Sequence, residues 1–356
     1  MFIRIDPFDP LFFRDGKPFS MGEDTWANCI FPPSPSVIYG ALRTVYFSNH
    51  IVELDHATTE QDVTKNLVIK GIYLLDNSNT ILLPLPLDFV QKKDLEESQE
   101  NEVELLSLVE LQLKSSCVTS YVLKGEEGVE AVTDGLISGD SLGKYLAFTG
   151  DKISTIKLSS RVLTEPKIGI GLNKQTRIAD ESKLYRVGMK RLKDISLLIE
   201  FEGLAIPDRG LLKFGGENKA AYYNEINGLA INWNLQDGNK DEKSEYFKLY
   251  LATPAVFTQG WLPSWIDSKS LEGKCQNTKF RLLTASVGKY HSLGGFDIVK
   301  KKPKPMWKAV PAGSVYYFKI IDGDFKDILN IFNGKSISDE YPEQGFGISF
   351  VGKISK

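Results

Sequence analysis

The stretch FDPLFFRDGKPFSMGEDTWANCIFPPSPSVIYGALRT, residues 8–44, contains the features on which the expected fold depends. It opens as an apolar strand and turns at Asp15-Gly16, where glycine tolerates the positive φ of such turns. Pro32-Pro33-Ser34-Pro35 then interrupts regular structure, and its serine and last proline suit the cap and first position of a helix. Apolar residues recur at helical spacing from Val37 to Tyr46, which predicts the helix itself.

The start of this helix has the features of an anion site. Free backbone amides, the hydroxyls of Ser34 and Ser36 and the positive end of the helix dipole would converge on one point. Arg43, further along the helix, could reach back toward the phosphates of a polymer. Gly40 costs about 1 kcal/mol relative to alanine, which indicates that another group approaches the backbone there. The alternative is that Ser34 only starts a buried helix.

Composition limits the class of protein. A length of 356 residues suggests two or three domains, and 43 Lys+Arg against 46 Asp+Glu give a net charge of -3. A nucleic-acid partner would therefore have to be bound by local patches. Cys29, Cys117 and Cys275 form no pair motif, which indicates a reducing compartment. Neither a signal peptide nor an apolar run of about 18 residues occurs, so we expect a cytoplasmic protein without a membrane partner.

The order of expected elements predicts an α+β fold with two units. Residues 67–89 read as a hairpin, so the chain begins as strand, helix, strand, strand, like the first part of a ferredoxin-like arrangement. We expect a first domain over residues 1–192, with an inserted helical and loop region. Residues 193–208 begin with the apolar run ISLLIEF, which we expect to open a second domain over residues 193–356 with glycine-rich loops.

A basic segment closes the first domain at residues 165–192. Two alternating arms enclose a polar tip, which predicts a β-hairpin that projects from the body. Its cationic residues are Lys167, Lys174, Arg177, Lys183, Arg186, Lys190 and Arg191. From Lys167 to Arg191 only Asp180 and Glu181 oppose these seven cations, so the charge of that span is +5. Such an arm suits a nucleic-acid backbone; the alternative is a solvated surface hairpin.

Three further segments are candidate sites for a phosphate backbone. Gly215-Gly216 and Lys219 form a turn after a strand, but the spacing excludes a P-loop. A purely cationic run with interleaved prolines extends from Lys300 to Lys308. The chain closes with Gly345-Phe346-Gly347 before a last strand. We expect this loop to meet the start of the opening helix, to bind the backbone with Ser34, Ser36 and Arg43, and to tolerate Gly347→Val without loss of thermal stability.

Catalytic motifs are missing from the sequence. His50, His56 and His291 show no metal-ligand spacing, and no GxSxG, HExxH or GxxxxGK[ST] occurs. His291 beside Lys289 and Tyr290 could support general acid–base cleavage of RNA. A ribonuclease therefore stays as an alternative.

Several long motifs occur in one order: FFRDGKPF, FPPSPSVIYGALRT, EPKIGIGLN, FGGENKAA, TPAVFTQGWLP, GGFDIVKKKPKP, VPAGSVYYF and the closing GFG. The series resembles the third-subunit family of the Cmr RAMP module, part of type III-B CRISPR–Cas effector complexes. The resemblance covers nearly the whole chain except the region around residues 55–165. It implies two ferredoxin-like (RRM-like) RAMP units, no catalysis and no cofactor or metal. The implied partners are the 5′ tag of the guide crRNA, the large polymerase/cyclase-like subunit and the adjacent RAMP backbone subunit.

We therefore expect a non-catalytic RNA-binding scaffold in antiviral defence, with a RAMP-type guide-RNA-processing endoribonuclease as the alternative. No RNP1 pattern occurs, so the sheet face is not the expected RNA site. A third reading is a protein-interaction scaffold without RNA contact, which paired basic residues and buried glycine loops would favour. The expected RNA contacts are Arg14, Ser34, Ser36, Tyr39, Gly40, Arg43, Lys167, Lys174, Arg177, Lys219, Lys302, Lys304, Gly345, Phe346 and Gly347.

Overall fold

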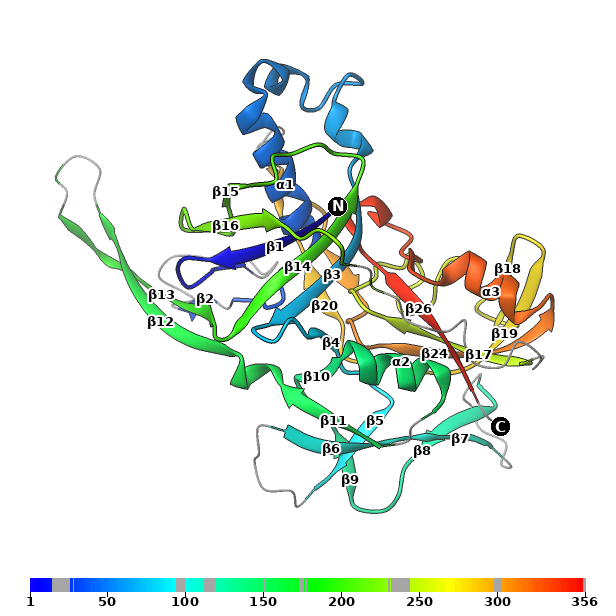
Figure 1. The fold of residues 1–356 in the computed structure, drawn as a ribbon. Coiled ribbons are helices and arrows are strands. Elements are labelled where there is room, and N and C mark those ends of the chain that lie inside the picture. The colour runs from blue at the N-terminus through cyan, green and yellow to red at the C-terminus, as the bar shows by residue number, and fades with distance from the viewer. Residues whose placement is uncertain are drawn as a thin grey trace.

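Two large antiparallel sheets form the centre of the computed structural model, one with eleven strands and one with six (Figure 1). The structure describes residues 1–14, 26–27, 29–93, 100–111, 119–149, 152–172, 176, 178–229, 231, 244–297 and 302–354. Strands dominate over helices, so the expected mixture of helix and strand is confirmed at this level.

The first sheet contains strands from residues 2 to 225. In sheet order these are β15 (Arg209–Lys213), β16 (Ala220–Glu225), β1 (Phe2–Pro7), β14 (Ile195–Glu202), β3 (Val68–Asp76), β4 (Ile81–Pro84), β10 (Gly135–Ser138), β11 (Lys152–Lys157), β6 (Glu100–Leu105), β5 (Phe89–Lys92) and β9 (Val129–Ala131). The second sheet contains β18 (Glu272–Cys275), β19 (Thr278–Ser286), β24 (Val315–Asp322), β17 (Tyr246–Leu251), β26 (Ile348–Lys353) and β25 (Lys335–Ser336).

Short sheets and helices lie around these two sheets. The additional strands are β12 (Val162–Leu172), β13 (Ala179–Leu192), β2 (Trp26–Ala27), β7 (Ser107–Glu110), β8 (Tyr121–Lys124), β20 (His291–Leu293), β21 (Phe296–Asp297), β22 (Lys302–Pro303) and β23 (Trp307–Ala309). The helices are α1 (Pro35–Asn49), α2 (Gly139–Ala147), α3 (Phe325–Phe332) and the 3-10 turns η1 (Ile51–His56), η2 (Val63–Asn66), η3 (Leu158–Ser160) and η4 (Pro342–Gln344). No helix in the described part of the chain is long and apolar enough to cross a membrane.

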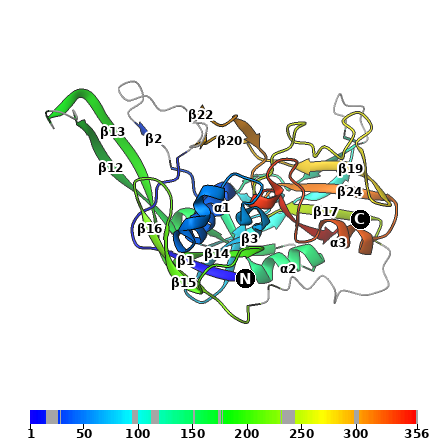
Figure 2. The ribbon, with the colours of Figure 1, turned by 90° about the horizontal axis from the view of Figure 1, so that it is seen from above.

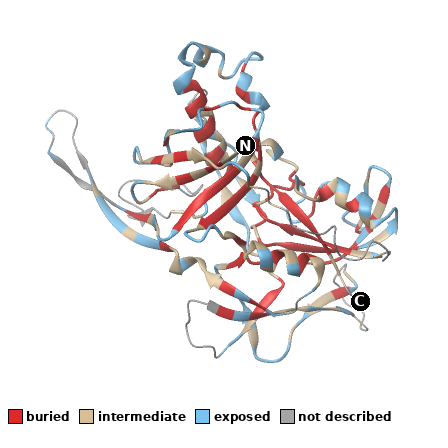
Figure 3. Cartoon of the chain, viewed as in Figure 1, coloured by how far each residue is buried: buried red, intermediate tan, exposed pale blue. Residues whose placement is uncertain are grey.

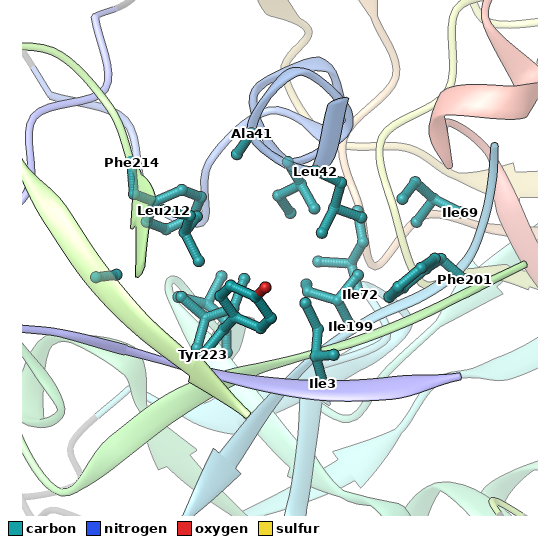
Figure 4. Close-up of a cluster of buried hydrophobic side chains, with 14 of the residues drawn as sticks. Ile3, Ala41, Leu42, Ile69, Ile72, Ile199, Phe201, Leu212, Phe214 and Tyr223 are labelled. Carbon is teal, nitrogen blue, oxygen red and sulfur yellow. The ribbon is translucent and has the colours of Figure 1, made fainter. Parts of the chain in front are cut away.

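Helix α1 begins where the sequence predicted, at Pro35 with Ser34 as the N-cap residue. Its apolar stripe, which includes Ile38, Ala41 and Leu42, is buried against one face of the first sheet (Figure 4). Burial of the larger of these side chains, Ile38 and Leu42, stabilises the folded state by about 1.5–3 kcal/mol each. The helix is therefore fixed by its packing, and the proline and serine at its start decide where it begins.

Strand β14 corrects one expectation. We expected the run at residues 195–202 to open the second domain, but it pairs with β1 on one side and with β3 on the other in the first sheet. The physical reason is that both of its faces are apolar. Leu197 and Ile199 pack in the cluster under α1, whereas Leu198 packs in the cluster between the two sheets. A strand buried on both faces belongs at the centre of a sheet.

The two sheets are stacked as layers with a shared core. One face of the first sheet packs on α1, and the other packs on α2 and on second-sheet residues that include Tyr250, Val315 and Phe350. The far face of the second sheet packs on Trp265 and on α3 through Ile328. Figure 3 shows the consequence, since the buried strands lie in the middle and the exposed segments project outward.

The two sheets have corresponding local orders of strands. In the first, β16, β1, β14 and β3 lie side by side, and α1 lies between β1 and β3 in the chain. In the second, β26, β17, β24 and β19 lie side by side, and α3 lies between β24 and β26. Each sheet thus contains a four-stranded antiparallel core with one helix in a connection.

Residues 84–89, PLPLDF, join the two sheets, and we call them the inter-sheet segment. The Tyr250 hydroxyl donates to the carbonyl of Pro84 at 2.6 Å, and the amide of Leu87 donates to the carbonyl of Gly313 at 2.8 Å. The Ser286 hydroxyl donates to the carbonyl of Leu87 at 2.7 Å. The segment is thus bonded to three parts of the second-sheet unit.

Asp88 in this segment is a fully buried carboxylate. Its Oδ2 accepts hydrogen bonds from the hydroxyl of Tyr145 in α2 at 2.6 Å and from that of Tyr317 in β24 at 2.5 Å. Burial raises the pKa of both phenols, and the neighbouring carboxylate raises it further, so both stay protonated donors. The ammonium of Lys248 lies 3.3 Å from the centroid of the Tyr145 ring. Asp88 therefore connects α2, the first sheet and the second sheet.

The hydrogen bonds to Asp88 make a prediction for stability. Tyr317→Phe removes one donor from a buried carboxylate, and we expect the free energy of unfolding to fall by about 2 kcal/mol. The control is Tyr290→Phe, which changes an exposed tyrosine and should stay within about 0.5 kcal/mol of the wild type. Equilibrium unfolding in urea measures both variants. Equal stability of the two would mean that the bond from Tyr317 adds nothing.

Candidate nucleic-acid interface

The residues predicted to contact RNA lie in three regions. These are the start of α1 with the loop before β26, the base of the β12–β13 hairpin, and residues 289–308, which we call the basic arm. Lys174 and Arg177, two of the predicted contacts, lie outside the described residues.

The loop before β26 lies beside the start of α1, as expected. The Ser36 hydroxyl donates to the side-chain oxygen of Gln344 at 2.7 Å, and Gln344 directly precedes Gly345. Strand β26 lies in the second sheet, whereas α1 packs on the first. The contact therefore joins the two units. Ser34 makes no side-chain hydrogen bond to the helix that it precedes.

The glycine loop itself is packed in the interior, which corrects the expectation of an open backbone site. Gly345, Phe346 and Gly347 are all buried. The amide of Gly345 donates to the Pro342 carbonyl, and that of Gly347 donates to the Pro254 carbonyl at 2.8 Å. Both amides thus have partners within the chain. The loop positions its neighbours and presents no free backbone donor from either glycine.

The two glycines are required by conformation and by space. Gly345 has φ +89° and Gly347 has φ +68°, which only glycine adopts at little cost. A Cβ on Gly345 would lie 2.7 Å from Cγ2 of Ile69, and one on Gly347 would lie 2.6 Å from the backbone nitrogen of Ser338. The expected tolerance of Gly347→Val is therefore wrong, because the added side chain would meet backbone that cannot move away.

Arg43 contacts other parts of this chain. Its Nε donates to Oγ1 of Thr64 at 2.6 Å, and its Nη2 pairs with Oδ2 of Asp62 at 2.7 Å. The Asp62 side chain is only 3% exposed, so this is a largely buried ion pair. Tyr39 donates through its hydroxyl to the Thr64 carbonyl at 3.3 Å. Arg43 and Tyr39 thus attach η2 to α1, and a phosphate contact by either of them stays a prediction.

Gly40 lies on the open side of the same helix. It is exposed, and nothing lies within 4 Å of the position that a Cβ would occupy. The close approach that we expected is therefore not made by the described part of this chain. An approach by another molecule at this position stays a prediction.

The β12–β13 hairpin is present and projects from the body, as predicted (Figures 1 and 2). At its base, Lys167 pairs with Glu217 at 2.7 Å, and Arg191 pairs with Glu165. Lys219 pairs with Asp9 at 3.2 Å. These carboxylates neutralise part of the positive charge that the sequence places there. Arg14 is exposed nearby, in a backbone bridge with Cys29.

The described residues of the basic arm, 289–297 and 302–308, form two short strand pairs. Strand β20 pairs with β23, and beyond them β21 pairs with β22. Lys302 and Lys304 are exposed, and neither has an ion-pair partner among the described residues. Lys308 lies with its ammonium 5.0 Å from the ring centroid of Tyr290, which is 49% exposed. The arm thus offers cations and an aromatic face to solvent.

Two members of the arm were absent from the predicted contacts, namely Tyr290 and Lys308. The sequence showed both residues, but eighteen positions separate them, and the pairing of β20 with β23 brings them together. His291 also lies on the arm, where desolvation lowers the pKa of its imidazole. Among the described residues, no group of three or more His, Cys, Asp or Glu side chains is arranged to bind a metal ion.

A family model and a curated relative both match nearly the whole chain. A family model described as CRISPR-associated protein (Cas_Cmr3) matches residues 3–354. A curated relative from Saccharolobus solfataricus, named CRISPR system CMR subunit Cmr3, is 26% identical over 336 residues, which cover 92% of this chain and 89% of the relative.

Solved structures match the fold. One is a chain in the cryo-EM structure of the Type III-B Cmr-beta bound to cognate target RNA, with a TM-score of 0.52 and 21% identity. Another is a chain in the Cmr-beta bound to cognate target RNA and AMPPnP, with a TM-score of 0.50 and 19% identity. Each match covers 89% of this chain and 86% of the other.

The packing around Gly347 can be tested against a glycine of equal conformation. Gly334 has φ +66° with nothing within 4 Å, whereas Gly347 has φ +68° and a filled surrounding. We expect Gly334→Ala to cost about 1 kcal/mol from conformation alone and Gly347→Ala about 3 kcal/mol. Thermal and urea unfolding give both values. Equal losses would show that the space beside Gly347 is open.

The contacts of Arg43 predict a structural effect of its removal. Arg43→Ala leaves the carboxylate of Asp62 buried without its partner, so we expect about 2 kcal/mol of destabilisation and faster amide exchange at residues 57–64. Arg209→Ala, at an exposed arginine of β15, is the control and should change neither property. Unchanged exchange at residues 57–64 together with weaker RNA binding would instead make Arg43 a phosphate ligand.

Proposed function

The chain belongs to the Cmr3 family of CRISPR-associated proteins, and from this we propose that it is a non-catalytic, RNA-binding scaffold subunit of a type III-B effector complex. In this proposal it binds the guide crRNA near its 5′ tag, contacts the large polymerase/cyclase-like subunit and adjoins a RAMP backbone subunit. It acts in the cytoplasm.

We infer that each large sheet contains a ferredoxin-like unit from which one helix is missing. The order β16, β1, β14, β3 and the order β26, β17, β24, β19 both fit a βαββαβ chain in which the third strand lies between the first and second. In the first unit α1 supplies the first helix, and residues 203–219 contain β15 in place of the second. In the second unit α3 supplies the second helix, and residues 252–277 contain no α-helix.

The single observation that supports RNA binding most strongly is the basic arm. Between residues 289 and 308 the sequence has six lysines and one acidic residue, Asp297. Lys302 and Lys304 are exposed and form no ion pair within the described residues, although Asp297 lies opposite Lys302 in the strand register. Exposed lysines of this kind can neutralise phosphates. The exposed face of Tyr290 is available to stack on a base. This combination suits a single-stranded segment, which a guide tag would be.

Two other readings make different predictions. The lowered pKa of His291 on a cationic arm is the one observation that favours the ribonuclease alternative, since a general base must be unprotonated. The ion pairs of Arg43, Lys167 and Lys219 and the burial of the glycine loop favour protein contacts at α1 and at the base of the hairpin. We therefore assign the guide backbone mainly to the basic arm.

The proposal predicts how charge reversal affects RNA binding. Lys302→Glu with Lys304→Glu should weaken binding of guide RNA by about tenfold or more and should lower the slope of log affinity on log salt by about two. The effect should be the same for all spacer sequences, because phosphate contacts are not sequence-specific.

The matched control reverses two exposed lysines elsewhere, Lys274 in β18 and Lys326 in α3, to glutamate. Fluorescence anisotropy at several salt concentrations measures both double variants. An unchanged slope for the arm variant would refute the arm as the RNA site. RNA cleavage by the purified protein that is lost in His291→Ala would establish the ribonuclease instead.

A further inference from the structure

Residues 50–66, which contain η1 and η2, form a projection beyond the C-terminal end of α1, drawn in blue at the top of Figure 1. The projection is mostly exposed in Figure 3. Four large apolar side chains on it face solvent, with exposed fractions of 71% for Ile51, 83% for Val52, 50% for Leu54 and 46% for Val63. Single exposed apolar residues are normal, but four within thirteen positions mark a contact surface.

The projection is held in place by specific interactions. The Tyr46 hydroxyl donates to Oε2 of Glu53 at 2.8 Å, and the Tyr46 ring stacks on His50 with centroids 4.3 Å apart. On the other side, Asp62 pairs with Arg43 and accepts the amide of Thr64 at 3.0 Å. Two polar networks thus fix the backbone on either side of the apolar residues. A surface that is already ordered loses little conformational entropy when it binds a partner.

The charge of the projection selects the kind of partner. Residues 50–66 contain four carboxylates, Glu53, Asp55, Glu60 and Asp62, against the single cation Lys65. Asp62 is neutralised by Arg43, whereas Asp55 and Glu60 are exposed. This negative surface repels phosphates, so it is unsuited to RNA. It complements a protein that has lysine or arginine beside an apolar groove.

We propose that this projection is a docking surface for another protein subunit, which receives Ile51, Val52 and Leu54 in an apolar groove and places basic side chains against Asp55 and Glu60. The inference rests on the proposed function in one respect, that the chain is a subunit of a larger complex. It adds which surface makes the contact. The basic arm binds RNA through the opposite charge, so the two surfaces serve different partners.

Assembly of the full-length chain with the other purified Cmr subunits of its own host and guide RNA tests this proposal. Ile51→Ser with Val52→Ser should lower the affinity for the assembly by about tenfold or more. Phe8→Ser with Leu211→Ser, at apolar side chains that are 60% and 65% exposed, is the control and should assemble like the wild type. All variants change exposed positions, so their melting temperatures should match that of the wild type.

The charge component has its own pair of variants. Asp55→Lys with Glu60→Lys should weaken assembly, and more strongly at low salt, whereas Glu126→Lys with Glu127→Lys on an exposed turn should not. Assembly of both projection variants at wild-type affinity would overturn the proposal. The proposal would also be overturned if the projection variants, as free chains, lost RNA binding, or if they lost a self-association that the wild type shows. Failure of the wild type itself to assemble would refute the proposed function. This outcome differs from failure of the docking proposal alone, in which the wild type and both projection variants assemble equally well.

Discussion

The two sheets and the inserted helix meet around a buried carboxylate, that of Asp88. Asp88 has no exposed surface, and a buried carboxylate without partners would be strongly destabilising. Its two hydrogen-bond donors come from α2 and from β24, and both bind Oδ2, whereas Oδ1 has no hydrogen-bond partner among the described residues. These two bonds form only when the inserted helix and both sheets are assembled together. Hydrogen bonds to the backbone of the inter-sheet segment also attach it to the second sheet. The two sheets are therefore one body, from which the hairpin, the basic arm and the projection extend.

Local features of the fold could be predicted from the sequence, and pairings between distant segments could not. The start of α1 follows from proline and serine at residues 32–36, and the β12–β13 hairpin follows from alternating residues around a polar tip. Strand β14 was misassigned because an apolar run shows that a strand is central but not in which sheet. Asp88 was not recognised, because its tyrosine partners lie 57 and 229 residues away.

The partners of charged residues in the candidate site could not be predicted from the sequence either. Lys167 and Lys302 look alike in the sequence, but Lys167 meets Glu217 across 50 residues, whereas Lys302 has no such partner in the described chain. Arg43 forms an ion pair with Asp62. Gly345 and Gly347 pack closely against Ile69 and Ser338, which leaves no room for a side chain. Composition identifies where charge is concentrated. Which cations form ion pairs within the chain depends on the tertiary structure.

The central claim is that guide RNA follows the basic arm of a subunit whose two sheets form one body. Photocrosslinking of the assembled complex, with thiouridine placed in the 5′ tag of the guide and mass spectrometry of the linked peptides, tests it most directly. The account predicts crosslinks to peptides within residues 289–308, with Tyr290 among the modified residues. Crosslinks confined to the start of α1 and the loop at residues 345–347, with none on the arm, would contradict it.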